Sequence, residues 1–97
     1  MNMKPLEGEV ALVTGATRGI GAAIADELAA RGATVIGTAT SESGAAAISE
    51  RLKAAGGAGR VLNVTEAGAI EALIDAVQAE HGGLSILVNN ARRKSVV

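Results

Sequence analysis

The sequence predicts an α/β protein of the Rossmann type: a doubly wound parallel sheet that stops after about four strands and three helices. Short apolar runs alternate with segments of about a dozen residues whose apolar residues recur every three or four positions. A glycine cluster joins the first apolar run to the first helical segment. The chain is 48% hydrophobic but contains no Phe, Tyr or Trp, so its core must be aliphatic, as is typical of parallel sheets covered by helices.

The expected elements follow one another as strand and helix. Strands are expected over residues 9–13, 33–37, 59–63 and 84–88. Helices are expected over residues 18–31, 44–55 and 66–81, the last capped by Thr65. Ile20, Ile24 and Leu28 give the first helix one apolar face. In a doubly wound sheet the fourth strand lies on the other side of the first, so a ligand is expected where these two strands end.

Composition argues against several classes of function. Nine basic and ten acidic side chains give a net charge of -1, so we expect neither nucleic-acid nor membrane-surface binding. Cysteine is absent, so neither disulfides nor thiolate metal sites are expected, and we expect no metal site. The first residues lack an apolar signal core and no run reaches transmembrane length, so a cytoplasmic protein is expected.

The stretch TGATRGIG, residues 14–21, carries the main functional signal. Its glycines follow a buried strand and precede a helix, where backbone N–H groups and the helix dipole favour phosphate oxygens. The spacing of Gly15, Gly19 and Gly21 differs from the G-x-G-x-x-G fingerprint. The loop is not a P-loop either, because no Gly-Lys-Ser/Thr sequence follows it. The alternative is a simple turn into the helix. We expect the loop to bind a dinucleotide pyrophosphate.

The residues after the second strand favour NADP(H) over NAD(H). A NAD site usually has an acidic residue there, but this chain has none before Glu42. The hydroxyls of Thr40 and Ser41 can donate to a 2′-phosphate, and Arg18 can supply a positive charge. The alternative for Arg18 is a solvated residue in the first helical turn.

TGATRGIG and the segment LVNNA, residues 87–91, resemble the N-terminal part of the short-chain dehydrogenase/reductase family. Within it, ALVTGATRGIG, VIGTATSESGA and LNVTEA resemble the bacterial 3-oxoacyl-[acyl-carrier-protein] reductases over residues 7–91. The resemblance implies a site formed by the glycine loop and the ends of the second, third and fourth strands. The implied NADP(H)-binding residues are Gly15, Thr17, Arg18, Gly19, Ile20, Gly21, Thr40, Asn63, Val64, Asn90 and Ala91.

The chain departs from the family in two respects. The family has glycine where this chain has Arg92, and residues 92–97 resemble nothing in the family, so we expect residues 1–91 to form the NADP-binding half-domain and 92–97 a tail. The resemblance also implies a catalytic tyrosine with a nearby lysine and serine, but the chain contains no tyrosine. His81 is expected at a helix end, where a cation suits the dipole, so no catalytic residue is assigned.

Three interpretations therefore remain. The chain could be the NADPH-binding half of such a reductase, inactive alone, with acyl-carrier protein as a partner only of the complete enzyme. It could be a non-catalytic dinucleotide-binding module. It could also be a truncated product that mainly self-associates, because the fourth strand would be left as an apolar edge.

Overall fold

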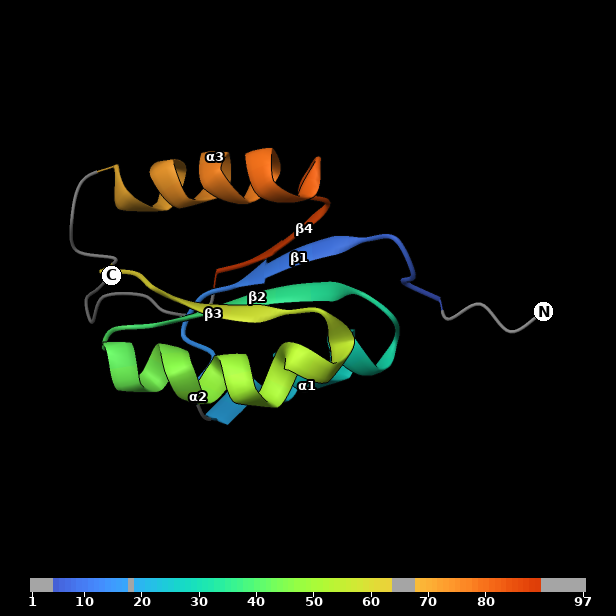
Figure 1. Ribbon diagram of the computed structural model, residues 1–97, viewed down its shortest axis with the longest axis horizontal. Coiled ribbons are helices and arrows are strands. Elements are labelled where there is room, and N and C mark those ends of the chain that lie inside the picture. Colours follow the sequence, from blue (N-terminus) through green and yellow to red (C-terminus); the bar gives the residue numbers. More distant parts are fainter. Residues whose placement is uncertain (1–4, 18, 64–67, 90–97) are drawn as a thin grey trace, which may run out of the picture.

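The computed structural model describes residues 5–17, 19–63 and 68–89 as a parallel sheet with helices on both faces (Figure 1). Helices α1 and α2 lie on one face of the sheet and α3 on the other (Figure 1). This arrangement confirms the predicted α/β fold. In chain order the elements are β1 (Val10–Val13), α1 (Gly19–Ala30), β2 (Thr34–Ala39), α2 (Glu42–Leu52), the 3₁₀ turn η1 (Lys53–Ala55), β3 (Ala58–Val61), α3 (Ala69–His81) and β4 (Ile86–Val88).

The strands lie in the order β3-β2-β1-β4 and all pair in parallel, as predicted. The register places Val13, at the end of β1, opposite Gly37 of β2 and Val88 of β4. The segments that follow β1 and β4 therefore leave the sheet side by side at the carboxyl ends of the strands, which is where ligands bind in doubly wound sheets.

The core consists of two aliphatic clusters, one on each face of the sheet. Alternate residues of a strand point to opposite faces. Accordingly Ala11 and Val13 belong to the cluster under α1 and α2, whereas Leu12 belongs to the cluster under α3 with Leu73 and Val77. All five side chains are fully or almost fully buried.

Two helix boundaries differ from the expectation because side-chain and glycine caps set them. Helix α2 begins at Glu42 because the Ser41 hydroxyl accepts the Gly44 N–H at 3.1 Å. Helix α3 begins at Ala69, and its N-cap is Gly68 with a φ of 79°. The predicted cap by Thr65 is wrong for this reason, and Thr65 itself lies outside the described residues.

The expected apolar face of α1 is only partly correct. Gly21 and Ala25 are the buried residues of this helix, so small side chains let it approach the sheet closely. Ile24 and Leu28 pack at the border of the core, but Ile20 is 72% exposed. The first residue of this apolar face therefore lies at the surface, and the other two are only partly buried.

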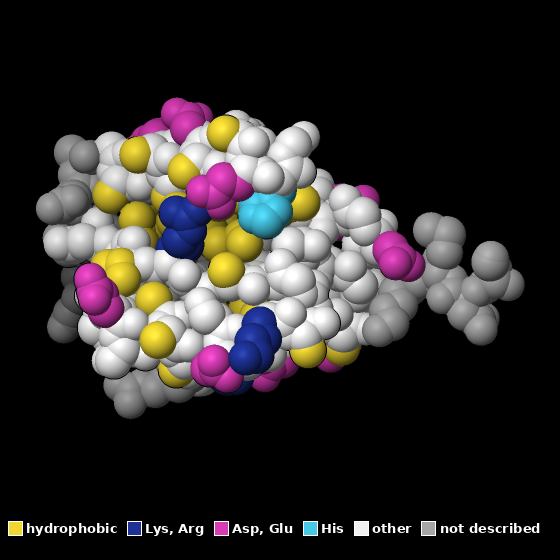
Figure 2. Space-filling model, viewed as in Figure 1, with side chains coloured by type: hydrophobic (Ala, Val, Ile, Leu, Met, Phe, Trp, Pro, Cys, Tyr) yellow, Lys and Arg dark blue, Asp and Glu magenta, His cyan; other side chains and the backbone are white. Residues whose placement is uncertain are grey.

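Charged side chains on the surface are mostly paired. Figure 2 shows apolar side chains between α3 and α2 on the side of the edge strand β3, with basic and acidic side chains around them. Arg60 of β3 and Glu80 of α3 form an ion pair there. Because Arg60 donates a hydrogen bond to Glu80, the pKa of this carboxyl is lower than its ordinary value.

Candidate nucleotide-binding site

The end of β1 is tied to the end of β4 through Thr14. Its side chain is fully buried, and its backbone N–H donates to the Val88 carbonyl at 3.0 Å. Its hydroxyl donates to Oδ1 of Asn89 at 3.2 Å. Asn89, the first of the two asparagines in LVNNA, therefore connects the two strands beside which the glycine loop begins.

The first part of the glycine loop rests on β2. The Gly15 N–H donates to the Thr38 hydroxyl at 3.1 Å, and the Ala16 N–H donates to the Thr38 carbonyl at 2.9 Å. A Cβ atom on Gly37 would lie only 2.9 Å from the Ala16 side chain. Glycine at position 37 therefore gives Ala16 the space to pack against the strand, and the loop is fixed between β1 and β2.

The second part of the loop opens toward solvent at the N-terminus of α1. Gly15 and Gly19 both have a φ of 67°, a left-handed conformation that favours glycine. A Cβ atom built on Gly19 would meet nothing within 4 Å, so the backbone faces open space there. The first N–H groups of a helix have no acceptor within the helix, and its dipole favours an anion. These features fit a pyrophosphate group.

The hydroxyl groups expected around a 2′-phosphate lie close to this loop. Thr40 follows the last residue of β2 and is exposed, as is Thr17 of the loop. The Thr17 methyl group lies 3.0 Å from where a Cβ on Gly44 would be, so Thr17 packs beside the first turn of α2. Ser41 is the N-cap residue of α2, and its hydroxyl oxygen accepts the Gly44 N–H.

The remaining predicted residues are distributed as follows. Gly21 is buried within α1, whereas Ile20 is exposed in its first turn. Asn63 is exposed and lies two residues after β3, at the carboxyl end of the parallel strands. The implied site residues outside the described part of the chain are Arg18, Val64, Asn90 and Ala91.

Sequence reasoning missed two residues that position the loop. Thr38 lay just beyond the predicted strand 33–37 and was given no role, but it belongs to β2 and is buried, and a buried polar side chain must find a partner. Arg51 lies thirty residues beyond the loop on another helix, and its Nη1 donates to the Ala16 carbonyl at 3.2 Å. Nothing in the local sequence indicates that contact.

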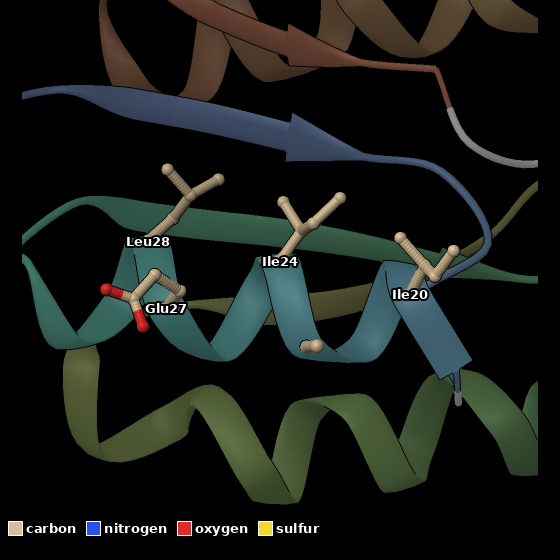
Figure 3. A pocket seen from close by; sticks show the side chains of 5 residues that line it. Ile20, Ile24, Glu27 and Leu28 are labelled. Atoms are coloured by element: carbon tan, nitrogen blue, oxygen red, sulfur yellow. The ribbon is translucent and has the colours of Figure 1, made fainter.

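The described residues contain neither a metal-binding cluster nor a membrane-spanning helix, but they do form an apolar groove. Across residues 5–17, 19–63 and 68–89, no three His, Asp or Glu side chains gather in a way that could hold a metal ion. No helix in this part of the chain combines the length and apolar character required to cross a membrane. An open apolar groove of about 410 Å³ runs along the side of α1 that is turned away from α2, where Ile20, Ile24 and Leu28 point the same way (Figure 3).

Comparisons with known proteins agree with this geometry. A family model described as short chain dehydrogenase matches residues 9–96. The chain is 62% identical over 85 residues to 3-oxoacyl-[acyl-carrier-protein] reductase FabG of Escherichia coli strain K12, covering 88% of this chain and 34% of that protein. Proteins of the same name from Vibrio harveyi and Pseudomonas aeruginosa are 63% and 57% identical over 89% of this chain and 35% and 36% of their own lengths. The chain thus spans about a third of these relatives.

Proposed function

Because the chain belongs to the short-chain dehydrogenase family, we propose that it is the NADP(H)-binding part of an oxidoreductase similar to 3-oxoacyl-[acyl-carrier-protein] reductase, an enzyme of fatty acid synthesis. The observation that carries the proposal is the glycine loop, which is fixed to β2 at Gly15 and Ala16 and faces open space at Gly19. Residues 1–91 would form this nucleotide-binding half, and residues 92–97 a tail outside it.

NADP(H) is the proposed cofactor because of the groups around the end of β2. Thr17, Thr40 and Ser41 offer hydroxyl donors near the first turn of α2, and no acidic residue precedes Glu42 there. Arg18 is proposed to meet the 2′-phosphate, since a guanidinium binds a phosphate through charge and two hydrogen bonds. Asn63 and Val64 are proposed beside the adenine, and Asn90 and Ala91 beside the riboses.

The chain alone is proposed to bind the cofactor without turning it over. Bound NADPH supplies a hydride donor, but reduction of a ketone also needs an acid that protonates the alkoxide, and the sequence contains no tyrosine for the family's acid. An acyl-carrier-protein substrate therefore belongs to a complete enzyme. The proposed location is the cytoplasm, with neither nucleic acid nor membrane as a partner.

Calorimetric titration of the purified chain with NADPH and NADH tests the proposal. We expect NADPH to bind at micromolar strength, NADH to bind more weakly, and Arg18→Ala to weaken NADPH by about tenfold through loss of a charged hydrogen bond. Arg31→Ala is the matched control, because Arg31 pairs with Glu27 at the far end of α1. Absence of NADPH binding by a folded chain would contradict the proposed function. Reduction of a ketone by the chain alone would contradict the proposed inactivity.

A second candidate function, self-association, is favoured by the edge strand β4. Within the described sheet β4 pairs only with β1, and its residues Ile86, Leu87 and Val88 are all apolar. Leu87 is 48% exposed, and the apolar groove lined by Ile20, Ile24 and Leu28 lies on the neighbouring helix α1. An apolar edge with unpaired backbone groups is a site for pairing with another chain, and we propose a second copy as that partner.

A further inference from the structure

We propose that Arg51 is a positioning residue for nucleotide binding, which holds the glycine loop and helix α1 in the arrangement that receives the pyrophosphate. This inference rests on the proposed function, because it concerns the loop to which that function is assigned. Arg51 lies in the last turn of α2, away from the loop in sequence, and its side chain is two-thirds covered.

The guanidinium of Arg51 makes three contacts that join separate parts of the fold. Nη1 donates to the carbonyl of Ala16 in the loop at 3.2 Å. Nη2 donates to the carbonyl of Ala22 in α1 at 3.3 Å and to Oδ1 of Asp26, one turn later, at 2.7 Å. Loop, α1 and α2 are thereby connected through one planar group. Arginine can do this because its donors form a rigid fork, whereas a lysine ammonium is a single point.

The contact to Ala16 adds a second backbone hydrogen bond to a loop residue that the sheet already holds. The Ala16 N–H donates to Thr38, and its side chain is fully buried. Its carbonyl is directed to Arg51. Ala16 stands between Gly15 and Gly19, which have the backbone freedom to let the loop rotate. Fixing both the N–H and the carbonyl of Ala16 restrains the peptide units on either side of this residue. This reduces the number of loop conformations, and hence the ordering cost of binding a ligand.

Arg51 is assigned to positioning and not to direct phosphate binding. Its charge is already matched by Asp26 at 2.7 Å, and two more of its N–H groups donate to the backbone carbonyls of Ala16 and Ala22. A residue that acts through the pyrophosphate loop should affect NADPH and NADH equally, because both contain this group. A residue that binds the 2′-phosphate should affect NADPH alone.

The test is calorimetric titration of the full chain with NADPH and NADH, at a temperature where circular dichroism shows each variant folded. We expect Arg51→Gln to weaken both nucleotides by the same factor, about tenfold, which corresponds to roughly one lost net hydrogen bond. Arg51→Lys keeps the charge and should weaken both by a similar factor. Lys53→Gln is the control, since Lys53 is exposed and forms an ion pair with Glu50 of the same segment, away from the loop. This variant should bind as the wild type does.

Hydrogen exchange of the amides of residues 15–22 provides a readout that does not depend on nucleotide binding. We expect faster exchange of these amides in Arg51→Gln and Arg51→Lys, with unchanged exchange in α3. If the wild-type chain binds neither nucleotide, the proposed function fails while this measurement still decides the role of Arg51. Unchanged affinities with unchanged exchange, or a loss confined to NADPH, would overturn the inference.

Discussion

At the scale of single residues, the site depends on buried polar groups that fix the glycine loop. Thr38 is 1% exposed and holds two consecutive loop residues, Gly15 through its hydroxyl and Ala16 through its carbonyl. Thr14 is fully buried and joins Val88 and Asn89. A buried donor that loses its acceptor costs more free energy than the bond itself contributes, so these contacts are sensitive to substitution.

Thr38→Val tests this dependence. Valine has the shape of threonine but no hydroxyl, so the Gly15 N–H loses this acceptor, and we expect the free energy of unfolding to fall by about 1–3 kcal/mol. Thr34→Val, at the half-buried start of the same strand, is the control and should change it by less than about 0.5 kcal/mol. Urea unfolding followed by circular dichroism measures both values, and equal effects would contradict the role given to the Thr38 hydroxyl.

The sequence predicted the loop residues better than the residues that support them. Gly15 and Gly19 follow from a recognisable local pattern, and their left-handed backbone agrees with it. The bonds from Thr38 and Arg51 join positions 23 and 35 residues apart, so they become visible only once the strands and helices are packed. Spacing in a sequence does not encode such contacts.

At the scale of elements, the size and the hydrogen bonds of the residues at a contact determine how closely a helix approaches a strand. A Cβ on Gly59 of β3 would lie 2.1 Å from the Ala45 carbonyl of α2, so glycine is required where these two elements touch. The Gly59 N–H also donates to the Ser49 hydroxyl of α2 at 2.8 Å. On the other face, the Arg60–Glu80 ion pair connects β3 to the last turn of α3.

This ion pair predicts a pH dependence of stability. The pKa of Glu80 is lower in the folded protein than its ordinary value of 4.5, because of its hydrogen bond with Arg60. Its stabilising effect is therefore fully present above pH 4.5 and is lost as the pH falls through the folded-state pKa. Glu80→Gln should unfold at a lower temperature than the wild type near neutral pH, by a small amount because the pair is exposed, and at the same temperature in strong acid.

Thermal unfolding at several pH values measures this difference. Asp75→Asn, an exposed position in the middle of the same helix, provides the control for changes in charge. A difference between Glu80→Gln and wild type that stays constant from neutral to strongly acidic pH would contradict the assignment.

Element types and their order were predictable, whereas the ends and faces of the helices were less so. Alternation of apolar runs with helical periodicity was sufficient to predict all four strands and their order in the sheet. Ile20, Ile24 and Leu28 were predicted as the apolar face of α1, but the fully packed residues of this helix are Gly21 and Ala25, while Ile24 and Leu28 are only partly buried. Periodicity marks an apolar face without distinguishing burial in this chain from exposure on its surface.

At the scale of the whole molecule, the two edges of the described sheet differ in character. β3 carries Gly59 and the charged Arg60, and α2 packs closely against it. β4 consists of three apolar residues, and the exposed Ile20 lies on the neighbouring α1. Charged residues on an edge strand oppose pairing with another chain, so only the β4 edge favours association.

Leu87→Lys and Val61→Lys form a matched pair for this prediction, because both side chains are 48% exposed and lie on opposite edge strands. We expect the wild-type chain to form dimers or larger species at high concentration. Leu87→Lys should raise the dissociation constant by about tenfold or more, and Val61→Lys should leave it unchanged. Light scattering across a concentration series measures this, and a wild-type monomer throughout the series would contradict the predicted association.

The central claim is that the glycine loop of this chain binds NADPH, and nuclear magnetic resonance of the ¹⁵N-labelled chain titrated with NADPH tests it most directly. We predict shifts concentrated on Gly15, Thr17, Gly19 and Thr40, with little change in the helix α3 amides. NADH should shift the same loop amides at higher concentration and move Thr40 less. Absence of shifts in a folded chain, or shifts confined to the apolar groove of α1, would contradict the claim.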